Sequence, residues 1–235
     1  MNIAVILSGG IGNRMGMDIP KQYSMVRGTP IVSFCMKQFI DNQRIDLIAI
    51  VAADEWRGLI NSELNKICNH KPVLFAQPGE TRQYSIFNAL SILNDNNVED
   101  DDIVIIHDAA RPLVSQRLIN DCLDGCEEAD GVMPVVPVKD TIYYSTDGNY
   151  VEQLLDRNFL KAGQAPEAFR FGKYYGAHLN MSREDILKIN GSTEMAVRSG
   201  LHCLMIDGDP MNFKITTPED LSAFESLLNK KDDLV

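Results

Sequence analysis

Long apolar runs are missing from this chain of 235 residues. No stretch approaches the roughly 18 consecutive apolar residues that a membrane-spanning helix needs. The first ten residues, MNIAVILSGG, lack the basic start and the cleavage site of a secretory signal. They predict a buried first strand instead. The sequence therefore predicts no membrane partner, and we expect a cytoplasmic protein.

Positive charge is also scarce. The chain has 22 Lys and Arg against 33 Asp and Glu, which gives a formal net charge of −11. A general nucleic-acid-binding protein needs a basic surface, so we expect no nucleic-acid partner. A small anionic ligand is compatible with this net charge, because salt screens surface charges beyond about 8 Å. Any phosphate site must then be built from a few converging cations.

The cysteines form neither a disulfide framework nor a metal motif. There are five, an odd number with scattered spacing. Cys122 and Cys126 share one face of a predicted helix, but no further ligand stands nearby in the sequence. His70, His178 and His202 show no ligand spacing either. We interpret the cysteines as reduced thiols in the core, as is typical of cytoplasmic proteins.

The chain does contain a regular alternation of apolar strands and amphipathic helices. Near-continuous apolar strands between helices favour a mostly parallel sheet that is covered on both faces. Ligands bind such sheets at the carboxyl ends of the strands. The prolines of the fifth strand indicate an edge or a distortion. The predicted strands are Asn2–Ser8, Leu47–Ala52, Pro72–Gln77, Asp102–Asp108, Gly131–Val138 and His202–Gly208. Helices are predicted over Pro30–Ile40, Trp56–Ile67, Tyr84–Leu93 and Leu118–Cys126, near Phe171, and from Pro218 with Thr217 as cap.

The alternation breaks after Val138. The stretch KDTIYYSTDGNYVEQLLDRNFLKAG predicts two strands joined by a turn at Asp147 and Gly148, which is a hairpin signal. We expect residues 139–162 to form a projecting arm. The rest shows no repeat and no interdomain linker, so residues 1–235 are predicted to form a single domain.

A glycine-rich stretch, LSGGIGNRMGMDIPKQY, follows the first predicted strand. Counted from Gly10, its third glycine, Gly16, comes one position too late for a dinucleotide fingerprint, and the Gly-Lys-Ser/Thr of a P-loop is absent. Glycines still let backbone N–H groups approach phosphate closely. Arg14 and Lys21 add charge and directed donors. The stretch predicts a phosphate-binding turn; the alternative is a structural turn with incidental cations.

Two further motifs follow predicted strands. In HDAARP, Asp108 stands at a strand end, where it suits a metal or a ribose hydroxyl, and Arg111 suits a phosphate. An ordinary Asp and Arg in a turn that ends at Pro112 would explain the stretch equally well. In GETRQYS, Arg82 and Ser85 stand at the mouth of a strand-to-helix turn, where helix capping explains them nearly as well as nucleotide contact. We interpret His107 as a packing or hydrogen-bonding residue rather than a base.

Several stretches together carry a family resemblance, in family order and over nearly the whole chain. They are GGIGNRMG, PKQY, HDAARP, PVKDTI, LLDRNFLKAGQAP and NFKITTPEDL. The chain resembles the 2-C-methyl-D-erythritol 4-phosphate cytidylyltransferases and their relatives, the ribitol-5-phosphate cytidylyltransferases. The resemblance implies an α/β, three-layer Rossmann-like nucleotide-diphospho-sugar transferase fold. It also implies CTP and a small polyol phosphate as substrates, Mg²⁺ as cofactor, and a homodimer formed through the arm.

The resemblance also implies roles for individual residues. Nucleotide contacts are expected from Ser8, Gly9, Gly10, Gly12, Gly79, Arg82, Ser85, Asp108, Ala109 and Arg111. Catalytic roles are expected for Arg14, Lys21 and Lys214. Acceptor contacts are expected from Thr141, Arg157, Thr193 and Lys214. Asp108 is expected beside the ribose or the metal ion. Because the arm exchanges across the dimer in this family, its residues would serve the active site of the partner.

The sequence departs from the family pattern near the acceptor. Thr193-Glu194 stands where the methylerythritol enzymes usually carry Thr-Asp-Asp or Thr-Asp-Glu, and residues 164–167 read QAPE where QTPQ is familiar. The SGGIG loop and Gly163 are closer to the ribitol enzymes, whereas HDAARP is closer to the methylerythritol enzymes. The acceptor stays open, with a slight preference for ribitol 5-phosphate.

Other functions are also compatible with parts of the pattern. They are transfer from another nucleoside triphosphate or to a sugar phosphate, a Rossmann oxidoreductase, and a non-catalytic nucleotide-binding module. The chemistry of cytidylyl transfer agrees with the absence of a nucleophile–base pattern, because a phosphate monoester is largely dianionic at pH 7 and is already a nucleophile. Such a reaction needs positioned cations rather than a base.

Overall fold

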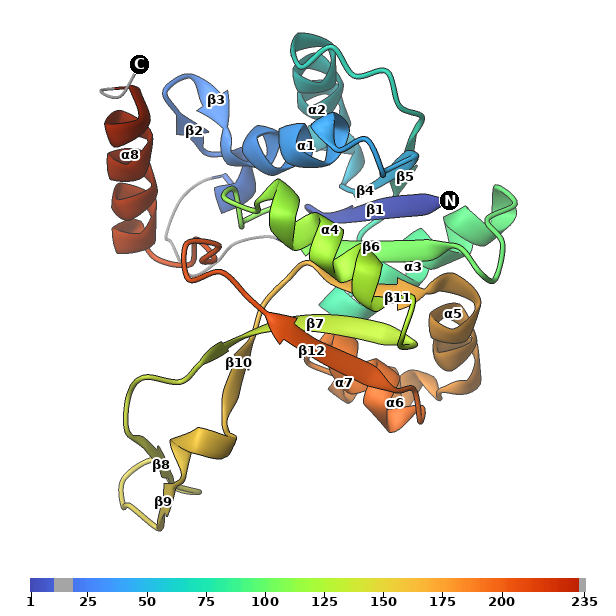
Figure 1. Ribbon diagram of the computed structural model, residues 1–235. Helices are drawn as coiled ribbons and strands as arrows, with labels where there is room; N and C mark the ends of the chain where they lie inside the picture. Colours follow the sequence, from blue (N-terminus) through green and yellow to red (C-terminus); the bar gives the residue numbers. More distant parts are fainter. Residues whose placement is uncertain (11–18, 233–235) are drawn as a thin grey trace.

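A mixed, mostly parallel sheet of eight strands forms the centre of the protein (Figure 1). The structure is a computed structural model that describes residues 1–10 and 19–232. The eight strands are β1 (Asn2–Leu7), β4 (Leu47–Val51), β5 (Val73–Ala76), β6 (Ile103–Asp108), β7 (Gly131–Pro137), β10 (Lys161–Gly163), β11 (Glu167–Arg170) and β12 (Cys203–Asp207). Their order is β10-β7-β11-β6-β1-β4-β5, and β12 also pairs with β7. Only β10 and β11 run antiparallel to their neighbours in this sheet.

Helices cover both faces of this sheet. The helices are α1 (Ile31–Asp41), α2 (Asp54–Lys66), α3 (Arg82–Asp95), α4 (Gln116–Gly125), α5 (Phe171–Asn180), α6 (Arg183–Lys188), α7 (Ser192–Arg198) and α8 (Pro218–Asp232). One core cluster joins the sheet to α1, α2 and α4, and a second joins it to α3, α5, α6 and α7. Three layers result, as the sequence predicts.

Strand β1 shows why this packing follows from the sequence. Side chains of a strand alternate between the two faces of its sheet. Ala4 and Ile6 belong to the core on the α1 side, whereas Ile3 and Val5 belong to the core on the α3 side. All four are fully buried. An uninterrupted apolar run is therefore what a strand covered on both faces requires.

Strand β7 is not at an edge, so that part of the sequence interpretation is wrong. It pairs with β11 over its first residues, with β10 over its last, and with β12 from Gly131 to Val135. Pro134 lies where its antiparallel partner changes from β11 to β10, and its carbonyl accepts from the N–H of Gln164 at 2.8 Å. Proline is tolerated here because the pairing is interrupted at this point. The short strand β11 between β6 and β7 was not expected from the sequence.

The predicted hairpin is present and projects from the sheet (Figure 1). Its strands are β8 (Ile142–Tyr144) and β9 (Gln153–Leu155), followed by the 3₁₀ turn η3 (Arg157–Phe159). Asp147 Oδ1 accepts hydrogen bonds from the N–H groups of Asn149 and Tyr150, and Gly148 has a φ of +73° that favours glycine. Large apolar side chains are exposed along this arm. They are Tyr143, Tyr144, Tyr150, Val151, Leu154 and Phe159.

Helix α8 packs away from the main sheet and forms a satellite core. It begins at Pro218, and Thr217 caps it as predicted, by accepting a hydrogen bond from the N–H of Asp220 at 3.3 Å. The buried Phe224 meets the ring of Phe34 edge-on at a centroid distance of 5.0 Å. The cluster also includes Val26, Ile31, Leu113, Phe213 and Ile215. Among the described residues, no helix has the length and apolar character to cross a membrane.

Two small elements lie between β1 and α1. The 3₁₀ turn η2 (Lys21–Tyr23) leads into a two-stranded hairpin of β2 (Met25–Val26) and β3 (Thr29–Pro30). Pro30 immediately precedes α1. These elements bring Lys21 back toward the end of β1, as the hydrogen bonds described below show.

Candidate functional site

The carboxyl ends of four parallel strands meet at one edge of the sheet. Leu7 at the end of β1 stands level with Asp108 of β6 and with Val51 of β4, and Val51 stands level with Ala76 of β5. The segments that follow β1, β5 and β6 therefore emerge side by side. These segments carry Ser8 to Gly10, Gly79 to Ser85 and Asp108 to Arg111. The structure thus brings together three of the predicted motifs.

Two glycines allow the first two segments to pack closely. A Cβ added to Gly9 would stand 2.6 Å from the Cβ of Pro78, and one added to Gly79 would stand 2.6 Å from the carbonyl carbon of Tyr84. Both distances are too short for any larger residue. The N–H of Gly79 donates to Ser85 Oγ at 3.0 Å, so Ser85 holds the turn before α3. The predicted residues Gly12 and Arg14 lie outside the described residues.

The segment Ser8 to Gly10 after β1 is called the glycine turn. Lys21 is held beside it by the two residues that follow Lys21. Gln22 Nε2 donates to the carbonyl oxygens of Ser8 at 2.8 Å and Gly10 at 2.7 Å, and the Tyr23 hydroxyl also donates to the Ser8 carbonyl. Neither Gln22 nor Tyr23 was predicted as a site residue from the sequence. Their only signal was their place in the PKQY stretch, directly after the predicted cation.

Asp108 is the centre of a cation cluster. Its Oδ1 lies 3.1 Å from Nε of Arg82, and its Oδ2 lies 2.9 Å from Nζ of Lys214 and 3.8 Å from Nε of Arg111. The Asp108 side chain is only 12% exposed, whereas that of Lys214 is 36% exposed. The cluster gathers residues from three distant parts of the sequence, and each of the four was predicted as a site residue.

Electrostatics keep Asp108 ionised in this cluster. Burial alone would raise its pKa, but the charges of Arg82 and Lys214 outweigh burial and hold the pKa of Asp108 well below its usual range. The adjacent His107 behaves in the opposite way, because burial lowers its pKa to about 4. Its Nε2–H donates to the carbonyl of Arg111 at 2.9 Å. His107 is thus neutral and structural, which confirms its interpretation as a hydrogen-bonding residue.

Two hydrogen bonds to backbone carbonyls explain how Lys214 reaches Asp108. Arg111 Nη1 donates to the carbonyl of Asn212 at 2.7 Å, and the N–H of Ile215 donates to the carbonyl of Ala110 at 2.8 Å. They tie the segment before α8 to the turn after β6 on both sides of Lys214. The predicted site residue Ala109 is buried, and its N–H donates to the carbonyl of Leu7 at 3.0 Å, so its contribution is backbone placement.

The buried Glu167 links the cation cluster to α7. Its Oε1 accepts from the N–H and the hydroxyl of Thr193 at 3.0 and 2.7 Å, and its Oε2 lies 3.5 Å from Nη2 of Arg82. Arg82 Nη1 also donates to Ser192 Oγ at 2.7 Å. Thr193 therefore lies at this site, with its hydroxyl bound to Glu167. In the sequence, the only signal of Glu167 is its departure from a family motif.

The arm residues are not part of this cluster within the chain. Thr141 and Arg157 are exposed, and Arg157 Nη1 donates to the carbonyl of Lys139 at 2.6 Å. The arm extends away from the strand ends (Figure 1). The structure thus leaves two predicted acceptor contacts on a separate surface.

These features define a class of protein. A three-layer α/β fold carries a tight glycine turn and a cation cluster at the carboxyl edge of its parallel strands, where such folds bind nucleotides. This is the architecture of a nucleotide-diphospho-sugar transferase, as the family resemblance implies.

Comparison with known proteins makes the assignment specific. The profile of the 2-C-methyl-D-erythritol 4-phosphate cytidylyltransferase family matches residues 2–230. A protein of that name from Clostridium beijerinckii is 37% identical over 218 residues, which cover 93% of this chain and 94% of that protein. The ribitol-5-phosphate cytidylyltransferase of Lacticaseibacillus paracasei is 30% identical over 234 residues, which cover 99% of this chain and 100% of that protein.

Solved structures agree with this result. The crystal structure of the Francisella tularensis 2-C-methyl-D-erythritol 4-phosphate cytidylyltransferase has a TM-score of 0.79 and 29% identity, and it covers 95% of this chain and 97% of that one. The chain belongs to the 2-C-methyl-D-erythritol 4-phosphate cytidylyltransferase family, and it is a cytidylyltransferase. The alternatives of an oxidoreductase and of a non-catalytic module are therefore set aside.

Proposed function

We propose that this enzyme joins CTP to a small polyol phosphate and releases a CDP-polyol and pyrophosphate. The observation that carries the proposal is the cation cluster around Asp108, in which Arg82, Arg111 and Lys214 lie beside the glycine turn. Lys21, fixed to the same turn through its neighbour Gln22, adds a further cation. Such a set suits two phosphate-bearing substrates that must approach each other.

The reaction needs charge stabilisation more than proton transfer. An oxygen of the acceptor phosphate attacks the α-phosphorus of CTP, a new P–O bond forms, and the bond to the pyrophosphate oxygen breaks. The acceptor is largely dianionic at pH 7, so it attacks without a general base. His107 at the site is consistent with this, since burial lowers its pKa to about 4 and makes it a weak base, and its Nε2–H is committed to the carbonyl of Arg111. Lys21 and Lys214 would neutralise the phosphates in the transition state.

A divalent cation, Mg²⁺, fits the proposed reaction. Among the residues that the structure describes, no group of three His, Cys, Asp or Glu could hold a metal ion. Mg²⁺ is commonly held by one or two carboxylates together with substrate phosphates, and the ionised Asp108 supplies one such carboxylate. When bound there, the ion would polarise the phosphate oxygens. Lys214, which now contacts Asp108, is exposed enough to turn toward a ligand.

The proposed acceptor is a polyol phosphate, and ribitol 5-phosphate is the first choice. The relatives named above include one enzyme named for each of the two acceptors. The SGGIG loop and Gly163 favour the ribitol assignment slightly, and the sequence at Glu167 and Thr193-Glu194 departs from the usual methylerythritol pattern. A second candidate is 2-C-methyl-D-erythritol 4-phosphate, which is supported by the HDAARP stretch and by the 37% identical relative.

We also propose that the arm forms a homodimer. Its exposed apolar side chains form a surface that water solvates poorly, and Phe159 is 85% exposed. Thr141 and Arg157 would then reach the acceptor in the active site of the partner. Sedimentation velocity at several concentrations tests this, and a monomer at micromolar concentration would contradict it.

A pyrophosphate-release assay tests the proposed function. The four nucleoside triphosphates are each combined with ribitol 5-phosphate, 2-C-methyl-D-erythritol 4-phosphate and a sugar 1-phosphate, with Mg²⁺ present. We expect release only from CTP with a polyol phosphate. Lys21→Ala should lower kcat strongly while the melting temperature changes little. Activity only with UTP, activity only with the sugar 1-phosphate, or normal turnover of Lys21→Ala would contradict the proposal.

A further inference from the structure

Two polar side chains are buried between the turn η2 and the end of β1. Gln22 is 3% exposed and Tyr23 is 1% exposed. An amide nitrogen carries two hydrogens. Those of Gln22 are both used, for the carbonyl oxygens of Ser8 and Gly10 at 2.8 and 2.7 Å. Gln22 therefore fixes two peptide groups of the glycine turn at once.

The carbonyl of Ser8 is held from two sides. Besides the bond from Gln22, it accepts a hydrogen bond from the hydroxyl of Tyr23 at 2.8 Å. A carbonyl oxygen has two lone pairs, so these two donors saturate it. Because the peptide bond is planar and trans, the N–H of Gly9 must point away from Gln22 and Tyr23. A donor N–H of the glycine turn thus has one fixed direction.

Tyr23 is itself locked in place. Its hydroxyl accepts a hydrogen bond from Ser8 Oγ at 2.9 Å, and its ring stacks on Trp56 of α2 at a centroid distance of 4.2 Å and an interplanar angle of 12°. The N–H of Ser8 donates to Val51 O at 2.9 Å. The glycine turn, the Lys21 turn and α2 therefore form one connected unit. We call Gln22 and Tyr23, with these bonds, the clamp.

We propose that Gln22 and Tyr23 are positioning residues for the donor nucleotide. They lock the turn that carries Lys21 onto the carbonyls of Ser8 and Gly10, so that backbone N–H groups and the Lys21 ammonium approach the triphosphate in one fixed arrangement. Both side chains act through their neighbours and do not touch the nucleotide. The inference rests on the proposed function, because it assumes that the glycine turn holds the phosphates of CTP.

Loss of the clamp should affect the two substrates differently. The acceptor side of the site depends on Lys214 and on the arm, which have no bond to the clamp among the hydrogen bonds described above. Loss of the clamp should therefore weaken the use of CTP and leave the use of the polyol phosphate almost unchanged. A role in stability alone would produce no such difference between the two substrates.

The variants Gln22→Leu and Tyr23→Phe test the clamp. The first keeps a side chain of similar size and removes both N–H donors, whereas the second keeps the ring that stacks on Trp56 and removes only the hydroxyl. Gln116→Leu is the matched control, because Gln116 Nε2 also donates to a backbone carbonyl, that of Gln38 at 2.7 Å, but on α4. All three are assayed for both substrates and for thermal unfolding.

For Gln22→Leu we expect kcat/KM for CTP to fall about 10- to 100-fold, as is typical when a supporting residue is lost. KM for the polyol phosphate should change less than about twofold, and Gln116→Leu should behave as wild type in both respects. Tyr23→Phe should lose about fivefold in kcat/KM for CTP, because it removes one of the two donors to the Ser8 carbonyl.

Three results would overturn the inference. They are wild-type kcat/KM for CTP in Gln22→Leu, an equal loss for both substrates, and an equal loss in the Gln116→Leu control. If Gln22→Leu does not fold, Tyr23→Phe decides by the same criteria. If the wild-type enzyme releases no pyrophosphate from CTP, the proposed function fails; the clamp is then tested by calorimetric titration with CTP, and equal Kd values for wild type and Tyr23→Phe would overturn it.

Discussion

Replacing Asp108 with Asn tests the centre of the site. The substitution keeps the shape of the side chain and removes its charge, which leaves Arg82, Arg111 and Lys214 close together with no carboxylate between them. Glu167 still faces Arg82, but it lies farther away, at 3.5 Å. The remaining cations repel one another, and Arg82 and Arg111 are largely buried, so water screens them poorly.

The expected cost follows from the burial of the cluster. Removing one partner of a buried ion pair costs about 3–5 kcal/mol. Lys214 is 36% exposed and can relax into water, so we expect the lower end of this range, about 3 kcal/mol. For a chain of this length, each kcal/mol shifts the melting temperature by about 2–4 °C. Asp108→Asn should therefore melt about 6–12 °C below wild type near pH 7.

The pH dependence of this difference has a definite sign. The folded pKa of Asp108 is lowered, mainly because the charges of Arg82 and Lys214 outweigh the opposing effect of burial. A lowered carboxylate pKa contributes stability that is complete above the unfolded pKa of about 3.9 and is lost as the pH falls toward the folded value. The difference between wild type and variant should thus shrink below pH 4, by at most about 1.4 kcal/mol per pH unit.

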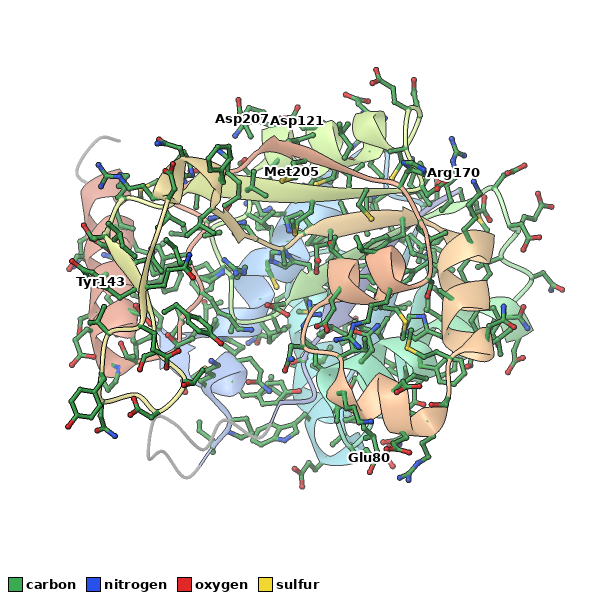
Figure 2. All side chains as sticks on the ribbon, turned by 90° about the horizontal axis from the view of Figure 1, so that it is seen from below. Glu80, Asp121, Tyr143, Arg170, Met205 and Asp207 are labelled. Carbon is green, nitrogen blue, oxygen red and sulfur yellow. The ribbon has the colours of Figure 1, made fainter. Side chains whose placement is uncertain are left out.

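Calorimetry at pH 7 measures the change in melting temperature. Urea unfolding between pH 3 and pH 7 measures how the stability difference depends on pH. Asp121→Asn is the control, because Asp121 pairs with Arg117 on the surface of α4 and both side chains are more than one third exposed. Figure 2 shows Asp121 on the outside of the molecule. This control should lose less than about 1 kcal/mol. An equal, small loss in both variants would refute the idea that the buried charge cluster depends on Asp108.

Three further predictions concern other parts of the protein. Gly9→Ala should lower the melting temperature and the activity, because its Cβ would stand 2.6 Å from a proline Cβ. A Cβ added to Gly10 would meet no atom of the described residues within 4 Å, so Gly10→Ala should fold normally; calorimetry compares the two, and equal melting temperatures would contradict the crowding. Phe224→Ala should lower the free energy of unfolding in urea by about 3–5 kcal/mol. It should also reduce turnover, because it loosens the core that packs against the Lys214 segment. Full activity would show that the position of this segment does not depend on the packing of α8. Burial lowers the pKa of His107 and of His178 to about 4, so the unfolded chain binds more protons than the folded chain between pH 6.5 and 4. As the pH is lowered through this window, the free energy of unfolding measured with urea should fall, by about 1–2 kcal/mol per histidine at pH 5. A flat profile would contradict the buried neutral histidines.

Much of the fold was predictable because its signals are local. The apolar run of β1, the helical spacing of α4 and the Asp147-Gly148 turn each follow from residues close in sequence. Strand β11 gave no such signal. It has only four residues, and it is a strand because it fits between β6 and β7, which are far from it in the sequence. The central place of β7 was missed for the same reason.

The candidate site divides in the same way. The sequence by itself determined the residue types, since glycines after a strand and a few Arg and Lys suffice to predict phosphate binding. Only the tertiary structure decided that Lys214 meets Asp108, that Glu167 engages both Arg82 and Thr193, and that Gln22 fixes the glycine turn. The physical reason is that hydrogen bonds and ion pairs act over about 3 Å in space, whereas Lys214 and Asp108, for example, stand 106 residues apart along the chain.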